Sequence, residues 1–438
     1  MLLNAADKAL WRLALPMIFS NITVQLLGLV DTAVIGHLDS PVYLGGVAVG
    51  ATATSFLFML LLFLRMSTTG LTAQAWGAKD PQRLARALVQ PLALALGAGV
   101  LIILLRLPLI DLALHIVGGS EAVLEQARRF LEIRWLSAPA SLANLVLLGW
   151  LLGVQYARAP VILLVVGNLL NIVLDLWLVM GLRMNVQGAA LATVTAEYAT
   201  LIIGLLMAKR VLTLRGVSLA MLKNAWRGDL RRLLALNRDI MLRSLLLQLC
   251  FGALTVFGAR LGSDIVAVNA VLMTMLTFTA YALDGFAYAV EAHSGQAYGA
   301  RDGSQLLEVW RAACRQSGMV ALAFALIYSL AGQYIIALLT SLPSLQQLAD
   351  RYLIWQTILP VVGVWCYLLD GMFIGATRGA EMRNSMAVAA AGFAVTLLTL
   401  PVLGNHGLWL ALAVFLALRG LSLALIWRRH WRRGTWFS

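Results

Sequence analysis

Long apolar segments decide what this chain can fold into. A helix that crosses a lipid bilayer needs about 20 mainly apolar residues, and in lipid its backbone polar groups must find partners within the segment. Twelve such segments occur among the 438 residues, at 11–36, 44–70, 86–108, 130–153, 160–181, 187–208, 237–260, 266–294, 312–332, 352–376, 384–402 and 407–427. Only 12% of the residues are charged, against roughly 25% in a soluble domain. The sequence therefore predicts an all-α polytopic membrane protein without a soluble domain of useful size.

An internal repeat organises these segments. AQAWGAKD at 73–80 recurs as GQAYGARD at 295–302, an offset of 222 residues, and at the same offset Gly153 corresponds to Gly375. Repetition of this kind marks duplicated structural units. Each half holds six segments, an even number, so both halves enter the membrane in the same direction. We expect two six-helix lobes that are related by a pseudo-two-fold axis along the membrane normal and enclose a central cavity.

Basic connections set the expected domains and topology. Lys and Arg gather in alternate connections, and the positive-inside rule places these in the cytoplasm together with both termini. The expected order is an N-lobe over 1–208, a basic cytoplasmic linker over 209–236, a C-lobe over 237–427 and a basic tail over 428–438. Residues 219–236 could form an amphipathic helix on the membrane surface, with arginines near anionic lipid; a solvated linker is the other interpretation. Topology thus explains the net charge of +13 without a nucleic-acid partner.

Polar side chains inside the first-half segments indicate a binding site. GNLLNIVLDLWLVMG at 167–181 carries two asparagines and an aspartate at i, i+3 and i+7, which places them on one helix face. The candidate coupling residues of this half are Asp31, Asn168, Asn171, Asp175, Thr193 and Glu197. An ionisable group inside a membrane is energetically expensive and therefore suggests a function. Carboxylates that converge there would bind a proton, or a sodium ion through oxygen ligands.

The second half carries different ionisable residues. Its candidates are Arg243, Asp284, Glu291 and Asp370. At the repeat offset Asp370 corresponds to Leu148, and the candidate acidic residues of each half have no acidic counterpart in the other. Packing common to both halves does not require them, so we expect two separate polar sites. For Arg243, which lies one turn after Asp239, a local ion pair is the favoured explanation.

Other chemistry is not indicated. GxSxG, Walker and GxGxxG loops do not occur in the contexts that would give them a function, and the cysteines and histidines are too scattered for a metal site. We therefore expect no enzymatic activity, no metal and no cofactor, with an ion gradient as the energy source. Pro16 removes a backbone hydrogen bond within the first segment and makes that helix bendable.

Several motifs carry a resemblance to a known family. PMIFSNITVQLLGLVDTAVIGHL, the GQAYGA-type repeat, NLLNIVLD and GAALATVTAEY together resemble the multidrug and toxic compound extrusion (MATE) transporters, over nearly the whole chain. The resemblance implies an antiporter of the bacterial inner membrane that exports small organic cations or amphipaths in exchange for protons or sodium ions. We expect a monomer, in contact with membrane lipid, that exchanges its substrate for protons by alternating access. The resemblance carries the coupling role to Asp31, Asn171, Asp175 and Thr193, with Pro16 as the bending point.

Alternative activities remain open. LLDGMFIGATRG resembles the family motif whose aspartate, here Asp370, binds a cation in sodium-coupled members. Those members also use a glutamate in the seventh helix, where this chain has Leu247 and Gln248, and this departure favours protons. A flippase for lipid or lipid-linked substrates would have a strongly basic central cavity, and the acidic cluster argues against it. An intramembrane transferase would carry paired aspartates, whereas NIVLD holds one acid.

Overall fold

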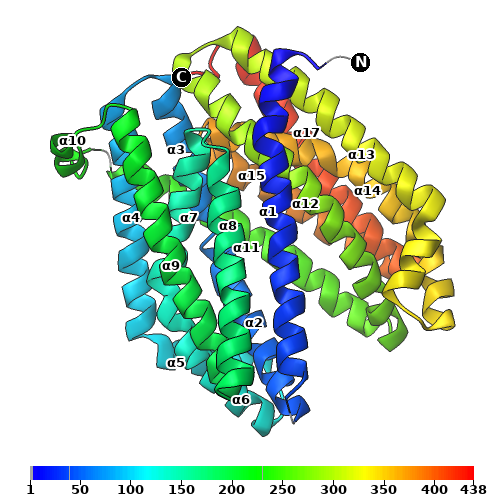
Figure 1. The fold of residues 1–438 in the computed structure, drawn as a ribbon. Coiled ribbons are helices and arrows are strands. Elements are labelled where there is room, and N and C mark those ends of the chain that lie inside the picture. The colour runs from blue at the N-terminus through cyan, green and yellow to red at the C-terminus, as the bar shows by residue number, and fades with distance from the viewer. Residues whose placement is uncertain (1–2, 39, 229) are drawn as a thin grey trace. The chain divides into compact units, whose positions relative to one another are not determined.

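The chain folds almost entirely into helices (Figure 1). The computed structural model describes residues 3–38, 40–228 and 230–438, apart from the side chains of residues 25–32. In chain order the helices are α1 (Ala5–Gly36), α2 (Pro41–Leu60), α3 (Phe63–Gly77), α4 (Pro81–Leu104), α5 (Arg106–Val117), α6 (Glu121–Arg134), α7 (Ala138–Gly153), α8 (Arg158–Asp175), α9 (Asn185–Leu214), α10 (Leu219–Asn224), α11 (Leu230–Arg260), α12 (Ser263–Ala300), α13 (Gly303–Leu339), α14 (Pro343–Gly375), α15 (Gly379–Thr396), α16 (Leu400–Leu403) and α17 (Asn405–Arg433). A 3-10 turn joins α6 to α7, another joins α15 to α16, and a π-helical turn, Leu176–Gly181, follows α8.

Eleven helical segments among the described residues are long and apolar enough to cross a membrane. They correspond to the predicted segments from 44–70 onward, although several extend further, such as α12 with 38 residues. The α1 helix, whose side chains are described only in part, has 32 residues, more than the roughly 20 that a bilayer requires. The shorter helices include α5 with 12 residues and α10 with 6. Both are too short to cross a bilayer.

The helices form two compact units. The first unit is Phe19–Leu233, and the second unit combines Met1–Ile18 with Leu234–Ser438. The division therefore falls within α1 and within α11, whereas the sequence suggested an N-lobe over 1–208 and a linker over 209–236.

The start of α1 packs on helices of the second unit. The indole Nε1 of Trp11 donates to Gln316 Oε1 over 2.9 Å, and the Trp11 ring lies edge-on to Phe286 with centroids 4.9 Å apart. Arg315 forms an ion pair with Asp7 at 3.0 Å. Trp11 and Gln316 are 305 residues apart in the chain. A contact between such distant residues leaves no local signal in the sequence.

The linker does not form one amphipathic helix. The α10 helix ends at Asn224 and α11 begins at Leu230, so the helix expected over 219–236 is interrupted. Between them Gly228 has a φ of +152°, a conformation that residues with a side chain rarely adopt. Glycine, which has no Cβ, adopts this conformation without steric strain.

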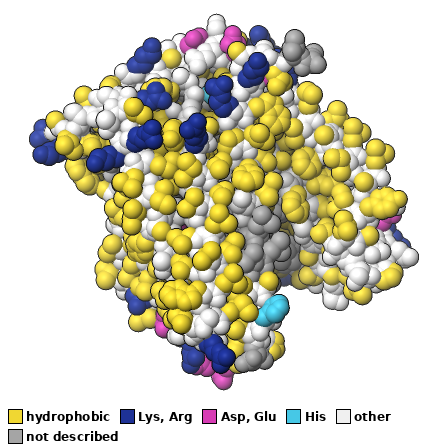
Figure 2. Space-filling model, viewed as in Figure 1, with side chains coloured by type: hydrophobic (Ala, Val, Ile, Leu, Met, Phe, Trp, Pro, Cys, Tyr) yellow, Lys and Arg dark blue, Asp and Glu magenta, His cyan; other side chains and the backbone are white. Residues whose placement is uncertain are grey.

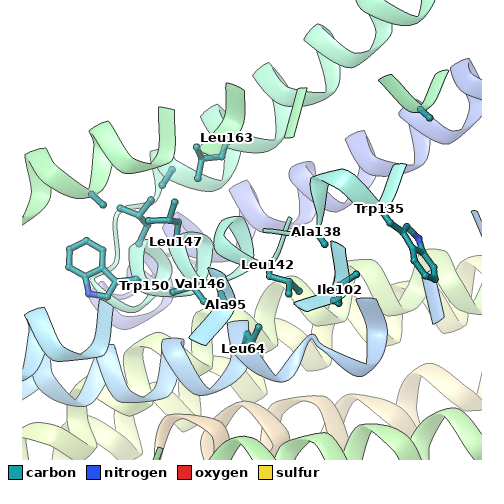
Figure 3. Close-up of a cluster of buried hydrophobic side chains, with 14 of the residues drawn as sticks. Leu64, Ala95, Ile102, Trp135, Ala138, Leu142, Val146, Leu147, Trp150 and Leu163 are labelled. Carbon is teal, nitrogen blue, oxygen red and sulfur yellow. The ribbon is translucent and has the colours of Figure 1, made fainter. Parts of the chain in front are cut away.

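The core of the first unit surrounds α7. Trp150 of α7 is fully buried, and its Nε1 donates to the Leu84 carbonyl over 3.1 Å. Figure 3 shows part of this core, with side chains from α3, α4, α7 and α8 that include Leu64, Ala95, Ile102, Leu142, Val146, Leu147 and Leu163. A helix that is covered on all sides needs no polar face. This explains why the last part of the predicted segment 130–153, residues 145–153, is apolar throughout.

Glycines bring helix backbones together at equivalent places in both units. In the first unit α7 packs on α3, and a Cβ added at Gly149 would lie 2.6 Å from the carbonyl oxygen of Arg65. In the second unit α14 packs on α12, and a Cβ added at Gly371 would lie 2.7 Å from the carbonyl oxygen of Ala287. The repeat offset of 222 residues relates both pairs. Small residues allow membrane helices to approach this closely, so the repeat preserves a backbone contact.

The end of the chain is folded against the second unit. Trp436 is 2% exposed, and its ring lies edge-on to Phe373 with centroids 5.1 Å apart. The Arg378 guanidinium donates to the backbone carbonyls of Thr435 and Trp436 over 3.0 and 2.6 Å. Part of the segment 428–438, which was expected as a basic tail, is therefore packed against the helices.

We predict that Gly375→Ala lowers the free energy of unfolding by about 1–3 kcal/mol, the usual effect of overpacking. A Cβ at this position would lie 2.5 Å from Ser294 Oγ and 2.9 Å from the Glu291 carbonyl oxygen. The matched control is Gly318→Ala in α13, where a Cβ meets nothing within 4 Å. Thermal unfolding of the two purified variants in detergent measures the effect. Equal midpoints would contradict the importance of this close approach.

Candidate functional site

A polar strip joins α8 and α9 in the first unit. Asn171 of α8 is buried, and its Nδ2 donates to Thr193 Oγ1 of α9 over 3.3 Å. The Thr193 hydroxyl also donates to the Ala189 carbonyl of its own helix over 3.2 Å. The structure thus brings together two of the residues that the sequence singled out.

Asp175 lies one turn beyond Asn171 on the same helix. Its side chain is 1% exposed, and it is the last residue of α8 before the π-helical turn Leu176–Gly181. Short π-helical turns inside helices occur frequently at functional sites. A carboxyl group at this depth must be neutralised by a proton, a cation or a polar partner, because a bare charge inside a membrane is costly.

Asn168 extends the strip towards α1. Its Nδ2 donates to Thr23 Oγ1 over 3.3 Å, so α8 contacts the part of α1 that belongs to the first unit. Asp31 lies further along α1, and its side chain is outside the described residues. Pro16 lies within α1, which continues as one helix through it, two residues before the division between the units.

Glu197 lies in a different place from the strip. The amide of Asn144, on α7, donates to Glu197 Oε2 over 3.0 Å and to its backbone carbonyl over 3.1 Å. Glu197 and Thr193 share α9, but the first contacts α7 and the second contacts α8. The sequence treated both as parts of one pocket. The described contacts divide them between two neighbouring groups.

Glu197 lines a cavity of about 410 Å³ in the first unit. The walls come from α2, α6, α7, α8 and α9, and the polar members of the lining are Thr54, Ser55, Arg134, Ser141, Asn144, Glu197 and Thr200. Aromatic and aliphatic side chains, including Phe58 and Leu148, make up the remainder. Ligand pockets of about 300–1,000 Å³ with a few polar groups on apolar walls suit small organic molecules.

In the second unit Asp370 lies between two guanidinium groups. Arg243 Nη2 donates to Asp370 Oδ2 over 2.7 Å, and Arg419 Nη2 donates to the same oxygen. All three side chains are buried. The expected local pair between Arg243 and Asp239 is therefore wrong. Asp239 instead pairs with Arg383 at 2.6 Å.

The two other candidates of the second unit lie on α12. Asp284 is half-buried and Glu291 is buried. The backbone carbonyl of Glu291 faces the Gly375 contact between α12 and α14. Within the described residues no group of three or more His, Cys, Asp and Glu side chains lies close enough to hold a metal ion.

The sequence analysis overlooked Arg419. It lies well inside the predicted segment 407–427, so the rule that identified the other intramembrane charges would have found it. At the repeat offset Arg419 corresponds to Glu197, and Asp370 corresponds to Leu148. In the first unit these two positions line the cavity. In the second unit they form an ion pair.

Comparison with known proteins assigns the chain to a family. The family model described as MatE matches residues 16–177 and 240–403, and the two matches fall in the two halves of the repeat. The chain therefore belongs to the MatE family, the MATE transporters that its motifs resemble. It is 87% identical over 436 residues to the DNA damage-inducible protein F of Escherichia coli (strain K12). The aligned region covers 100% of this chain and 95% of that protein.

More distant proteins share the fold. The probable multidrug resistance protein NorM of Acinetobacter baylyi is 23% identical, over 96% of this chain and 94% of its own. The solved outward-facing conformation of a multidrug resistance MATE family transporter of the MOP superfamily matches with a TM-score of 0.84 at 23% identity, covering 98% of this chain and 96% of that one. The predicted all-α, twelve-helix, two-lobed fold is confirmed. Because the family consists of transporters that bind small organic substrates, the protein is a membrane transporter rather than an enzyme.

We predict that Asp370→Asn lowers the free energy of unfolding by about 3–5 kcal/mol, because it leaves buried guanidinium groups without their carboxylate. The matched control is Asp264→Asn, an exposed residue in the first turn of α12, which we expect to change stability by at most about 1 kcal/mol. Thermal unfolding in detergent compares the two variants. An unchanged midpoint for Asp370→Asn would mean that the ion-pair cluster does not stabilise the second unit.

Proposed function

We propose that this transporter is a secondary active antiporter that exports cationic or amphipathic organic compounds in exchange for protons. It would lie in the bacterial inner membrane as a monomer, with both termini in the cytoplasm as the basic connections suggest. The observation that carries the proposal is the buried carboxyl of Asp175 beside the Asn171–Thr193 hydrogen bond. A buried carboxyl group beside neutral hydrogen-bonding side chains is suited to bind and release a proton during transport.

The strip and the cavity use the same two helices. The cavity lining includes Leu164 of α8 and Glu197 of α9, while Asn171 lies two turns further along α8 and Thr193 one turn earlier on α9. A change in the charge of Asp175 therefore acts on helices that also form the cavity wall. We infer that protonation of Asp175, together with Asp31, weakens substrate binding in the cavity.

Alternating access follows from this coupling. A proton that enters from outside neutralises the Asp175 site, α1 bends near Pro16, and the substrate is released to the outside. The proton then leaves towards the cytoplasm as the transporter returns. Pro16 is suited to this role because it weakens the backbone hydrogen bonding of α1 next to the division between the two compact units.

Sodium coupling is the alternative, and the contacts of Asp370 argue against it. A sodium ion would need oxygen ligands without bound cations, whereas Asp370 already accepts from Arg243 and Arg419. The positions Leu247 and Gln248, on the helix where a second acid would be expected, are not acidic. We therefore assign the coupling ion to the first unit and the role of Asp370 to structure.

The decisive measurement is the uptake of a fluorescent lipophilic cation into inverted membrane vesicles. Uptake driven by an acidic vesicle interior should occur with the unmodified chain and fall to the level of empty vesicles with Asp175→Asn, which cannot carry the proton. The exposed Asp264→Asn is the control and should leave uptake unchanged. Uptake driven by a sodium gradient that survives Asp175→Asn would overturn the proposal. No uptake by the unmodified chain would favour a lipid flippase.

A second prediction concerns charge selection in the cavity. Glu197→Gln keeps the shape of the side chain and its contact with Asn144 but removes the negative charge. We expect the apparent affinity for cationic substrates to fall roughly tenfold, while that for neutral amphipaths stays within about twofold, because only cations lose an ionic partner. Competition by cationic and neutral compounds in the same vesicles measures both. Equal losses for the two classes would show that Glu197 acts on the cavity shape and not on charge.

A further inference from the structure

A basic pocket lies in the first unit, outside the strip and the cavity. Its volume is about 100 Å³, and Arg83 and Arg86 of α4 and Arg232 of α11 contribute to its walls. The apolar part of the lining consists of Leu71, Ala87, Pro91 and Leu233. Figure 2 shows several Lys and Arg side chains at the upper left, over the end of this unit where α10 lies, bordering an apolar surface.

The pocket is fixed in place by α10 and the turn that follows it. Gln82 Nε2 of α4 donates to the Met221 carbonyl over 3.4 Å, and the buried Gln90 Nε2 donates to the Ala225 carbonyl over 3.3 Å. These bonds hold the short α10 helix beside α4, although six residues alone would not form a stable helix. The pocket is therefore part of the folded unit and not a loose cluster of surface charges.

Gly228 shapes the wall around Arg86. A Cβ added at Gly228 would lie 2.4 Å from Arg86 Nε, so the backbone of the turn passes directly over the guanidinium group. Within the part of the chain that the structure describes, Arg86 Nε is buried and has no hydrogen-bond partner. A partly buried guanidinium group without a partner favours an anion that can accept its hydrogen bonds.

The carboxylate that caps α4 is already engaged. Asp80 caps the helix, and its Oδ1 accepts from the backbone N–H groups of Gln82 and Arg83 over 3.1 and 3.3 Å. Among the described residues neither Arg83 nor Arg86 takes part in a salt bridge. The pocket thus presents two guanidinium groups that no described carboxylate neutralises. Arginine pairs of this kind bind phosphate oxygens through several donors.

The surroundings of the pocket indicate the source of the phosphate. Leu219, the first residue of α10, is 77% exposed, and Trp226, just after this helix, is 63% exposed. Leu230 at the start of α11 is also exposed. Apolar and tryptophan side chains beside basic residues are typical of a helix that lies in the interface of a membrane. A soluble phosphate would gain nothing from this apolar border, whereas a lipid has acyl chains to place against it.

We propose that the pocket formed by Arg83, Arg86 and Arg232 binds the phosphate headgroup of an anionic phospholipid, with the acyl chains against the apolar border around α10. Basic pockets at the membrane surface recognise anionic headgroups in this way. The site is independent of the transported compound. It attaches the segment between the two halves of the chain to the lipid surface.

The test uses the purified full-length chain in detergent. Phosphatidylglycerol and phosphatidylcholine are titrated separately, and bound lipid is counted by native mass spectrometry. We expect phosphatidylglycerol to bind the unmodified chain at least about tenfold more tightly than phosphatidylcholine. The double variant Arg83→Gln/Arg86→Gln should bind the two lipids about equally. The control is Arg210→Gln, an exposed arginine on α9, which should keep the preference.

Three results would overturn the proposal. The first is equal binding of the two lipids by the unmodified chain, a result that does not depend on the variants folding. The second is a loss of the lipid preference with Arg210→Gln as large as that with the double variant, which would indicate attraction to general surface charge. The third is displacement of phosphatidylglycerol by an equal concentration of inorganic phosphate, which would assign the pocket to a soluble anion. If the double variant does not fold, Arg83→Gln alone should still reduce the preference.

Discussion

The close approach of helix backbones at glycine is the contact on which the rest of the structure depends. Gly149 on α7 and Gly371 on α14 leave no room for a Cβ against the facing carbonyl oxygens. Because hydrocarbon gives membrane helices little apolar incentive to associate, such packing contributes much of what holds them together. The same contact in both units fixes the positions of α7 and α14, and with them the side chains that these helices carry into the interior.

One scaffold therefore supports two different interiors. Leu148 and Glu197 line a cavity in the first unit, while the equivalent Asp370 and Arg419 pair with each other in the second. A carboxylate that faces a cavity is available to a ligand, whereas a carboxylate held by two arginines is not. The two halves thus share their backbone contacts but differ in their charged side chains. The first unit has a cavity that is open to a ligand, and the second has an ion pair that stabilises its fold.

The sequence revealed the fold more completely than the site. Apolar length and the repeat predicted a helical membrane protein in two halves, because both signals are local or periodic. The pairing of Asn171 with Thr193 followed from helical periodicity and an assumption that the helices converge. The pairing of Arg243 with Asp370, 127 residues away, could not be predicted, because helix periodicity identifies only neighbours on the same helix. The side chain of Asp31 lies outside the described residues, so its place beside Asp175 stays a prediction.

The docking of the start of α1 on the second unit has a consequence for how the chain is assembled. Asp7 and Trp11 contact Arg315 and Gln316, which follow about 300 residues later in the chain. Chains are made from the N-terminus, and their domains generally fold in that order. Here Asp7 and Trp11 have no packing partners in α13 until that helix has been synthesised. The start of α1 thus reaches its final position only after α13, although it precedes every other helix in the sequence.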